Sequence, residues 1–211
     1  KYDLLSLPVV DAEDRLTGRI TVDDIVDVIE EEATEDILRL AGVGGEIIGS
    51  PQAAHAVRAR LPWLALNLVT ATISAAAIAL FEQTIEKVAI AAAFMTIVAS
   101  QGGNAGVQTM TLMVRGLAIG ELHAANTMRI LRRESLVALI NGLLLGFVAG
   151  GVVYIWRGDL ALSLVLGSAM LINLLVAAVL GSLVPTMLEL LGIDPAVSSS
   201  VLVTAGTDVL G

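Results

Sequence analysis

The sequence predicts an all-α, multi-pass membrane protein with five transmembrane helices, preceded by a short β/α segment and an acidic connecting helix. Hydrophobic residues make up 56% of the chain and its mean hydropathy is +0.84, which is too apolar for an ordinary soluble domain. Residues 1–46 contain 13 acidic and 4 basic residues, whereas residues 47–211 contain 8 of each. A soluble, strongly acidic segment is therefore expected to precede a membrane-embedded part.

Five apolar segments follow the acidic part, at about residues 61–81, 88–114, 136–156, 160–191 and 195–211. Pro62 and Trp63 are expected to stand at the entrance of the first segment. A membrane-spanning helix needs about 20 apolar residues. The fifth segment has 17 residues, so its helix is expected to be cut short.

Basic residues predict the orientation of the chain. Arginines precede the first apolar segment and separate the second from the third, namely Arg58, Arg60, Arg115, Arg129, Arg132 and Arg133. The alternate connections carry only Lys87 and Arg157. Because cytoplasmic loops are enriched in Lys and Arg, the N-terminus is expected in the cytoplasm of a protein that crosses the cell membrane several times.

Several function classes are excluded by composition. The chain has no cysteine, so it has neither a disulfide framework nor a thiolate metal site. It lacks the basic footprint of a nucleic-acid-binding protein. The two histidines, His55 and His123, fall in the expected cytoplasmic connections, and no nucleophile–base pair stands out. We therefore do not expect an enzyme.

Asp208 is an isolated carboxylate within the fifth apolar segment. A charged residue at the centre of a spanning helix costs roughly 2.5–3.5 kcal/mol on insertion scales. Such a residue usually faces a water-filled path, a partner or an ion. Asp208 is therefore the first candidate functional residue.

The second apolar segment contains an unusual polar stretch, Ser100 to Thr109, with three glycines and three amide side chains. Irregular backbone at membrane depth is tolerated only where it is buried or lines an aqueous cavity. A bent or locally opened helix is expected here, with carbonyl oxygens turned toward a hard cation or its bound water. The alternative is a helix kink with interhelical hydrogen bonds.

Gly142, Gly146 and Gly150 repeat every four residues in the third apolar segment, so they share one helix face. They predict a close helix–helix contact, either within one subunit or between two subunits.

The N-terminal part is expected to contain two short strands, at residues 7–11 and 18–22, and a helix that begins near Thr21 to Asp24. Between Asp23 and Asp36 lie eight acidic residues and no basic one. Like charges four residues apart oppose a helix by roughly 0.2–0.5 kcal/mol per pair. Either solvent or bridging divalent cations must relieve this repulsion.

Three motifs, in order, resemble one known family. The stretch from Gly18 to Asp36 resembles the end of the second CBS domain and the connecting helix of MgtE-type magnesium transporters. The run Gly102-Gly-Asn-Ala-Gly-Val-Gln108 resembles their second-span motif, and Thr207-Asp208-Val209 resembles part of their fifth span. The resemblance covers essentially the whole chain.

The resemblance implies a homodimeric, magnesium-selective channel with five transmembrane helices per subunit. It implies that cytosolic Mg²⁺ closes the pore through CBS domains and an acidic helix called the plug. On this basis residues 1–22 are the end of a CBS domain, residues 23–60 the plug and linker, and residues 61–211 the pore domain. The expected partners are a second copy, the lipid bilayer and the N-terminal cytosolic domains of the same full-length chain.

The resemblance also assigns metal contacts, with Mg²⁺ as both transported and regulatory ion. Asp208 is the expected pore carboxylate, and the adjoining pore wall contains Gly103, Asn104 and Thr204. The acidic positions expected to bind regulatory ions are Asp24, Asp27, Glu32, Glu35 and Asp36. Magnesium keeps several of its waters, so a pore with few carboxylates and outer-sphere contacts suits it.

Three alternatives remain open from the residues. An Asp with amides and carbonyls also suits cobalt or manganese. In a proton-coupled carrier, Asp208 would titrate rather than attract a cation. In a membrane scaffold that transports nothing, Asp208 would pair with a partner.

Overall fold

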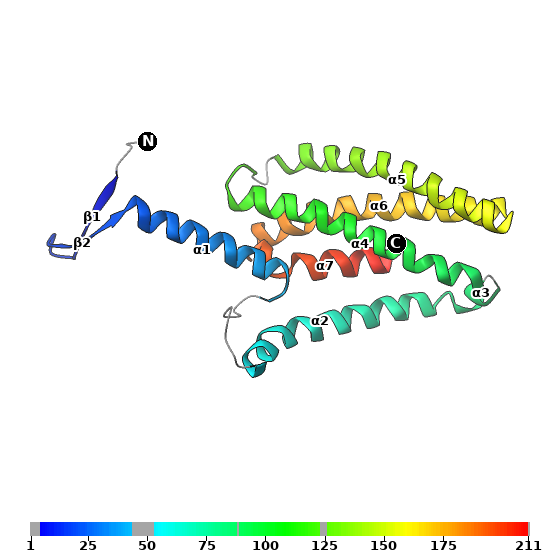
Figure 1. Cartoon of the computed structure of the whole chain (residues 1–211), viewed down its shortest axis with the longest axis horizontal. Helices are drawn as coiled ribbons and strands as arrows, with labels where there is room; N and C mark the ends of the chain where they lie inside the picture. The colour runs from blue at the N-terminus through cyan, green and yellow to red at the C-terminus, as the bar shows by residue number, and fades with distance from the viewer. Residues whose placement is uncertain (1–4, 44–52, 88, 123–125, 211) are drawn as a thin grey trace.

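The computed structural model describes residues 5–43, 53–87, 89–122 and 126–210. Two strands and seven helices follow one another in these residues. They are β1 (Ser6–Val10), β2 (Leu16–Thr21), α1 (Val22–Leu40), α2 (Ala53–Ala79), α3 (Glu82–Lys87), α4 (Ala89–Ala118), α5 (Thr127–Arg157), α6 (Leu160–Leu190) and α7 (Pro195–Leu210). The helices from α2 onward form an elongated bundle, and α1 leads away from one end of it to the β1–β2 hairpin (Figure 1).

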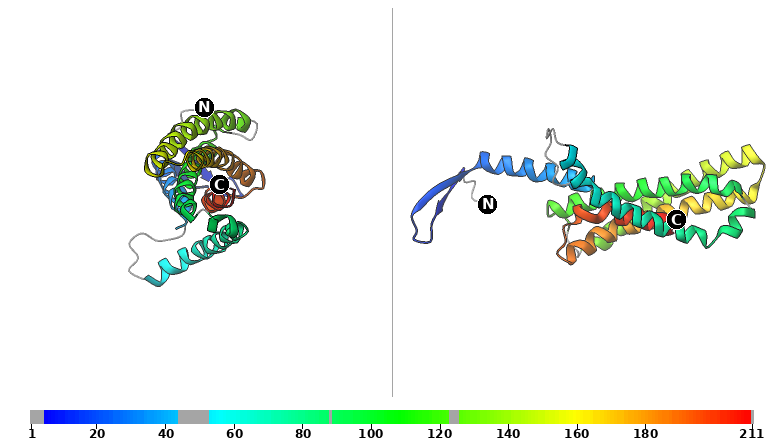
Figure 2. Two further views of the ribbon diagram at one scale, coloured as in Figure 1. Left: turned by 90° about the vertical axis from the view of Figure 1, so that its right-hand side faces the viewer. Right: turned by 90° about the horizontal axis from the view of Figure 1, so that it is seen from below.

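The two strands and α1 together form an N-terminal arm, which has the predicted strand–strand–helix order. Strand β1 pairs with β2 in an antiparallel hairpin. The backbone N–H and hydroxyl of Thr21 each donate a hydrogen bond of 2.7 Å to Asp24, which fixes the start of α1. The last turn of α1 lies next to the bundle and contacts the region of α7. The β1–β2 hairpin lies far from the other helices (Figure 2).

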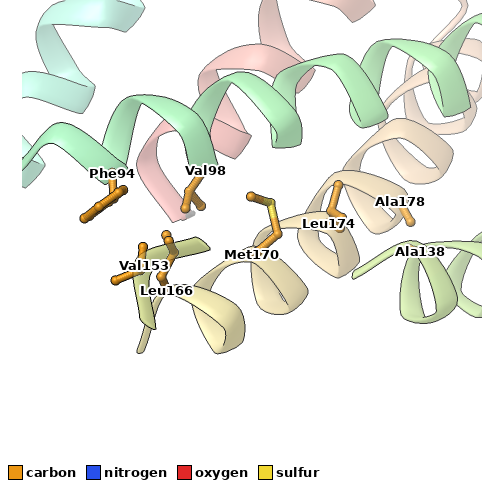
Figure 3. Packing of buried hydrophobic residues seen from close by; sticks show 8 residues of the cluster. All are labelled: Phe94, Val98, Ala138, Val153, Leu166, Met170, Leu174 and Ala178. Atoms are coloured by element: carbon orange, nitrogen blue, oxygen red, sulfur yellow. The ribbon is translucent and has the colours of Figure 1, made fainter. Parts of the chain in front are cut away.

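The core of the bundle lies between α4, α5 and α6. Its buried apolar residues, drawn in Figure 3, are Phe94, Val98, Ala138, Val153, Leu166, Met170, Leu174 and Ala178. Helix α7 packs against α4 and α6, with Met110, Val114, Ala196 and Val203 buried in a second cluster. Helix α2 lies along α7, on the side of the bundle away from α5 (Figure 1).

Each predicted apolar segment overlaps one helix of the bundle, in the order α2, α4, α5, α6 and α7. Helices α2, α5 and α6 are long and apolar enough to cross a membrane. Helix α4 is not among these three, although it has 30 residues, because its polar stretch interrupts the apolar sequence. Helix α7 has 16 residues. Five crossings per chain therefore stay a prediction.

The first long helix begins before Pro62, so the entrance of Pro62 and Trp63 into the membrane stays a prediction. Helix α2 begins at Ala53, and Pro62 lies inside it. His55 belongs to the first turn of this helix and is exposed, whereas His123 lies outside the described residues.

The glycine repeat packs within the chain, which confirms the first of the two interpretations. A Cβ atom on Gly146 would lie 2.6 Å from the carbonyl oxygen of Gly167, and one on Gly150 would lie 2.8 Å from that of Ser163. Gly142 faces Leu171 in the same way. The repeat thus allows the backbones of α5 and α6 to touch.

The expected opening of the second span was wrong. Helix α4 is α-helical through the whole stretch from Ser100 to Thr109. Its glycines serve close packing instead, because a Cβ on Gly106 would lie 2.6 Å from a methyl group of Val203. An interhelical hydrogen bond does occur, from the Asn173 amide to the Val98 carbonyl at 2.8 Å.

Candidate functional site at the α2–α7 cleft

Helix α7 carries Asp208 in its last turn. Asp208 lies 13 residues after Pro195, about 20 Å along the helix at 1.5 Å per residue. Thr207 is fully buried and its hydroxyl donates a 2.9 Å hydrogen bond to the Thr204 carbonyl. Asp208 itself is only partly buried. Helix α7 therefore packs into the bundle through the side that carries Thr207, and the Asp208 carboxylate lies on a more exposed side.

Asp208 lines a cleft of about 420 Å³ between α2 and α7. Helix α7 contributes Thr204, Ala205 and Asp208. Helix α2 contributes Leu64, Asn67, Leu68, Thr70 and Ala71. The polar lining is thus one carboxylate, one amide and two hydroxyls, all oxygen-bearing groups suited to a hydrated hard cation.

Asn67 and Thr70 were not predicted from the sequence. Asn67 is the only amide side chain between residues 61 and 81, and this is the signal that would have indicated it. An amide in an apolar span, like a carboxylate, is costly unless it faces polar surroundings.

Gly103 and Asn104, the two α4 residues predicted to form the pore wall, lie differently with respect to the cleft. A Cβ on Gly103 would lie 4.0 Å from a methyl group of Thr204, so Gly103 stands beside the α7 face that carries the cleft. Asn104 is exposed and does not line the cleft. It belongs to an exposed polar stripe on α4 with Gln108 and Thr111. The structure therefore brings Gly103, Thr204 and Asp208 together and leaves Asn104 on the adjoining outer surface.

The predicted regulatory residues are spread along α1. Asp24 caps the helix, and the hydrogen bonds from the Thr21 backbone and side chain lower its pKa. Asp27 and Glu32 are exposed, and Glu35 forms an ion pair with Arg39. In the described ranges, no three histidine, aspartate or glutamate side chains lie close enough to hold a metal ion.

Asp36 lies in a second cleft, of about 150 Å³, where α1 meets the ends of α4 and α6 and the start of α7. Glu189 and Asp194 line it as well. Burial and the neighbouring charge of Asp194 raise the pKa of Asp36. Three carboxylates therefore border one small cleft at the junction of arm and bundle.

Arg39 joins the arm to the bundle at this junction. Its guanidinium donates to Asp194 and also pairs with Glu35. Although partial burial opposes its charge, these two carboxylates raise the pKa of Arg39. This contact could not be predicted from the sequence, because the residues that it joins are 155 positions apart.

Glu134 is a further acidic residue that the sequence analysis missed. It is only 7% exposed, and it accepts a 3.3 Å hydrogen bond from the Thr109 hydroxyl. The Arg133 guanidinium is 3.9 Å away but mostly exposed. Glu134 thus connects α5 to α4.

Comparison with known proteins defines the class. Residues 95–211 match the family model MgtE, described as a divalent cation transporter. The chain is 38% identical over 208 residues to a protein of Enterococcus faecalis, 35% over 210 residues to one of Bacillus subtilis, and 38% over 212 residues to one of Thermus thermophilus. Each of these proteins is named magnesium transporter MgtE. The matches cover 99–100% of this chain and 46–47% of each relative, so the chain spans about half their length.

The helical bundle with its apolar helices, together with this family match, thus defines a class of helical membrane transporters. The chain is a member of the MgtE family of divalent cation transporters. This membership confirms the predicted family and a multi-pass membrane location, and it places the chain outside the enzymes.

Proposed function

We propose that this chain forms the membrane part of a magnesium channel, in which hydrated Mg²⁺ passes Asp208. The observation that carries the proposal is the partly buried Asp208 carboxylate, which shares a cleft of an otherwise apolar bundle with three polar side chains, Asn67, Thr70 and Thr204. Magnesium dehydrates reluctantly and is bound through few carboxylates and its own waters. One carboxylate with hydroxyl and amide neighbours suits an ion that keeps its hydration shell.

A second copy of the chain completes the path in this proposal. One chain supplies a single carboxylate to the cleft, whereas two copies would supply a charge that balances Mg²⁺. The exposed stripe of Asn104, Gln108 and Thr111 supports the same idea. Amide side chains that face lipid are unfavourable, and a two-fold partner or an aqueous path would cover them. The proposed assembly is a homodimer with the α4 stripe near its axis.

We assign the arm to regulation. Residues 1–22 are the proposed end of a CBS domain, and α1 is the proposed plug, with the N-terminus in the cytoplasm. The Arg39 contact supports coupling, because it ties the last turn of α1 to Asp194, immediately before α7. A movement of the acidic helix would thereby reach the helix that carries Asp208. High cytosolic Mg²⁺ would neutralise the acidic residues and hold the path closed.

The proposal is tested by Mg²⁺ uptake into vesicles that contain the purified full-length protein and a magnesium-sensitive dye. Passive uptake down the Mg²⁺ gradient, unaffected by a protonophore at clamped membrane potential, is the expected result. Collapse of uptake with the protonophore would favour a proton-coupled carrier. Because the family is described for divalent cations in general, uptake of Mn²⁺ and Co²⁺ is measured in parallel.

Regulation is tested by replacing five acidic residues with their amides, namely Asp24, Asp27, Glu32, Glu35 and Asp36. We expect flux that no longer falls as Mg²⁺ rises on the cytosolic side, because neutral amides cannot replace the attraction of an ion bridge. An unchanged inhibition curve would leave these residues as a solvated surface.

A further inference from the structure

Asn173 is a polar residue buried in the middle of the bundle, away from the cleft of Asp208. It lies on α6 with a side chain that is 0% exposed. Its amide donates a 2.8 Å hydrogen bond to the Val98 carbonyl of α4. Val98 belongs to the apolar cluster of Figure 3, so this bond crosses a dry part of the core.

The Asn173 amide lies flat against Gly102, within the glycine motif of α4. A Cβ atom on Gly102 would lie 2.5 Å from Oδ1 and 2.6 Å from Cγ of Asn173. Gly102 and Asn173 therefore fit only as a pair. The next residue, Gly103, is turned by about 100° around the helix axis, since an α-helix has 3.6 residues per turn. This rotation brings Gly103 beside Thr204 on α7.

Asn173 does not favour the stability of the folded protein at this position. Its Oδ1 is buried and, within the described part of the chain, accepts no hydrogen bond. An unsatisfied buried acceptor destabilises a protein, and an apolar side chain of the same shape can be neutral or stabilising in its place. The helix would already satisfy the Val98 carbonyl through its own i→i+4 bond. Stability therefore does not account for an amide at this position.

We propose that Asn173 is a positioning residue for the ion path. Its amide fixes the height and rotation of α4 at Gly102, and thereby sets Gly103 and Asn104 relative to Thr204 and Asp208. This inference rests on the proposed transport function. It predicts that loss of the amide changes ion affinity or ion preference, while the folded bundle persists.

The test measures uptake against ion concentration, for Mg²⁺ and for Mn²⁺, in vesicles with full-length wild-type protein and N173L. N141L is the matched control, because Asn141 is exposed on α5. We expect N173L to keep or raise the thermal midpoint in detergent. Its half-saturating Mg²⁺ concentration, or its Mg²⁺-to-Mn²⁺ rate ratio, should shift about threefold or more, the effect of about one net hydrogen bond. N141L should change neither quantity.

A merely structural role gives a different result. It would lower the amount of folded protein and the maximal rate together, with the half-saturating concentration and the rate ratio as in wild type, and this outcome overturns the inference. The double variant G102A/N173A provides a second test, since the smaller side chain makes room for the added methyl group. Wild-type kinetics in the double variant would also overturn it, because packing would then suffice. N173A serves in place of N173L if the latter does not fold.

Position is also measured without transport. Residues 1–211 contain no cysteine, so a G103C/T204C pair introduces the only two thiols into this part of the protein. We expect slower disulfide formation in the N173L background than in the N141L background, and equal rates would contradict the inference. D208N is assayed beside these variants. Wild-type flux in D208N would count against the proposed function, whereas an N173L variant without any effect would count against the role of Asn173.

Discussion

Nine polar or charged residues are buried in the described part of the chain, and the surroundings of the polar side chains indicate their roles. Glu134 accepts a hydrogen bond from the Thr109 hydroxyl, and the Asn173 amide donates one to the Val98 carbonyl. Asp208 instead lines a cleft. A buried polar group without a hydrogen bond destabilises a protein by about 1–3 kcal/mol. Glu134 thus has a hydrogen-bond partner, whereas Asp208 lines the cleft that the proposed function assigns to the ion.

The role of Thr109 is tested with T109V. This change removes the hydrogen bond to the buried Glu134 carboxylate, so we expect a loss of about 1–3 kcal/mol in the free energy of unfolding in detergent. T111V is the control, because Thr111 is exposed and its hydroxyl binds the Val107 carbonyl of its own helix. Equal stabilities of the two variants would show that Glu134 does not depend on Thr109.

Asp36 predicts a pH dependence at the junction of arm and bundle. Burial and the neighbouring Asp194 raise its pKa in the folded protein above the ordinary value of 3.8. Its ionised form therefore opposes the contact between α1 and α7. This penalty is present above the raised pKa and disappears as the pH falls through it toward 3.8.

We therefore expect D36N to tighten this contact at neutral pH and to remove that part of its pH dependence. The measurement is amide hydrogen exchange at residues 36–41, compared with D27N, which changes an exposed carboxylate of the same helix. Faster exchange in D36N than in D27N would contradict the account.

The bundle is held together by contacts between pairs of helices, and small residues determine how closely the two helices of a pair approach. Gly146 and Gly150 bring α5 onto α6, while Gly106 admits Val203 of α7 onto α4. The same glycines would weaken an isolated helix by roughly 1 kcal/mol each relative to alanine. Their contribution is thus made between helices rather than within one.

Gly146 and Gly151 of α5 distinguish the role of glycine in helix–helix contact from its effect on the helix itself. A Cβ on Gly146 would lie 2.6 Å from the Gly167 carbonyl oxygen, whereas one on Gly151 would have nothing within 4 Å. We expect G146A to lower the free energy of unfolding by about 1–3 kcal/mol, as overpacking does. G151A should be neutral or stabilising by up to about 1 kcal/mol. Thermal unfolding in detergent measures both, and a G146A variant as stable as G151A would show that the two helices can separate without cost.

Hydropathy predicts the helices of the bundle well but misses the starts of two of them. The fourth and fifth segments match α6 and α7 to within one residue. Helices α2 and α5 begin eight and nine residues before the apolar segments, since arginine-bearing turns continue each helix into the polar region. Helix α4 stays regular across its glycines, because α6 and α7 pack against them. Such tertiary contacts override local propensity and cannot be seen in a single segment.

At the scale of the whole molecule, the site depends on contacts between distant segments. Asp208 was predictable, because a carboxylate is conspicuous in an apolar run. The cleft that it lines was not, since Asn67 and Thr70 come from a helix about 140 residues earlier in the sequence. The contact of Arg39 with Asp194 was hidden for the same reason. Together these contacts connect an acidic arm to the helix that carries the proposed ion path.

The most direct test of this account is the Mg²⁺ flux of D208N in vesicles with the full-length protein. The change removes the charge of Asp208 and keeps its shape, and E82Q provides the same carboxylate-to-amide change at an exposed position of α3. We expect D208N to assemble and unfold like wild type, with a flux reduced about tenfold or more, equivalent to at least about 1.4 kcal/mol. E82Q should transport at the wild-type rate. A folded D208N protein with wild-type Mg²⁺ flux would contradict the claim that the ion passes Asp208.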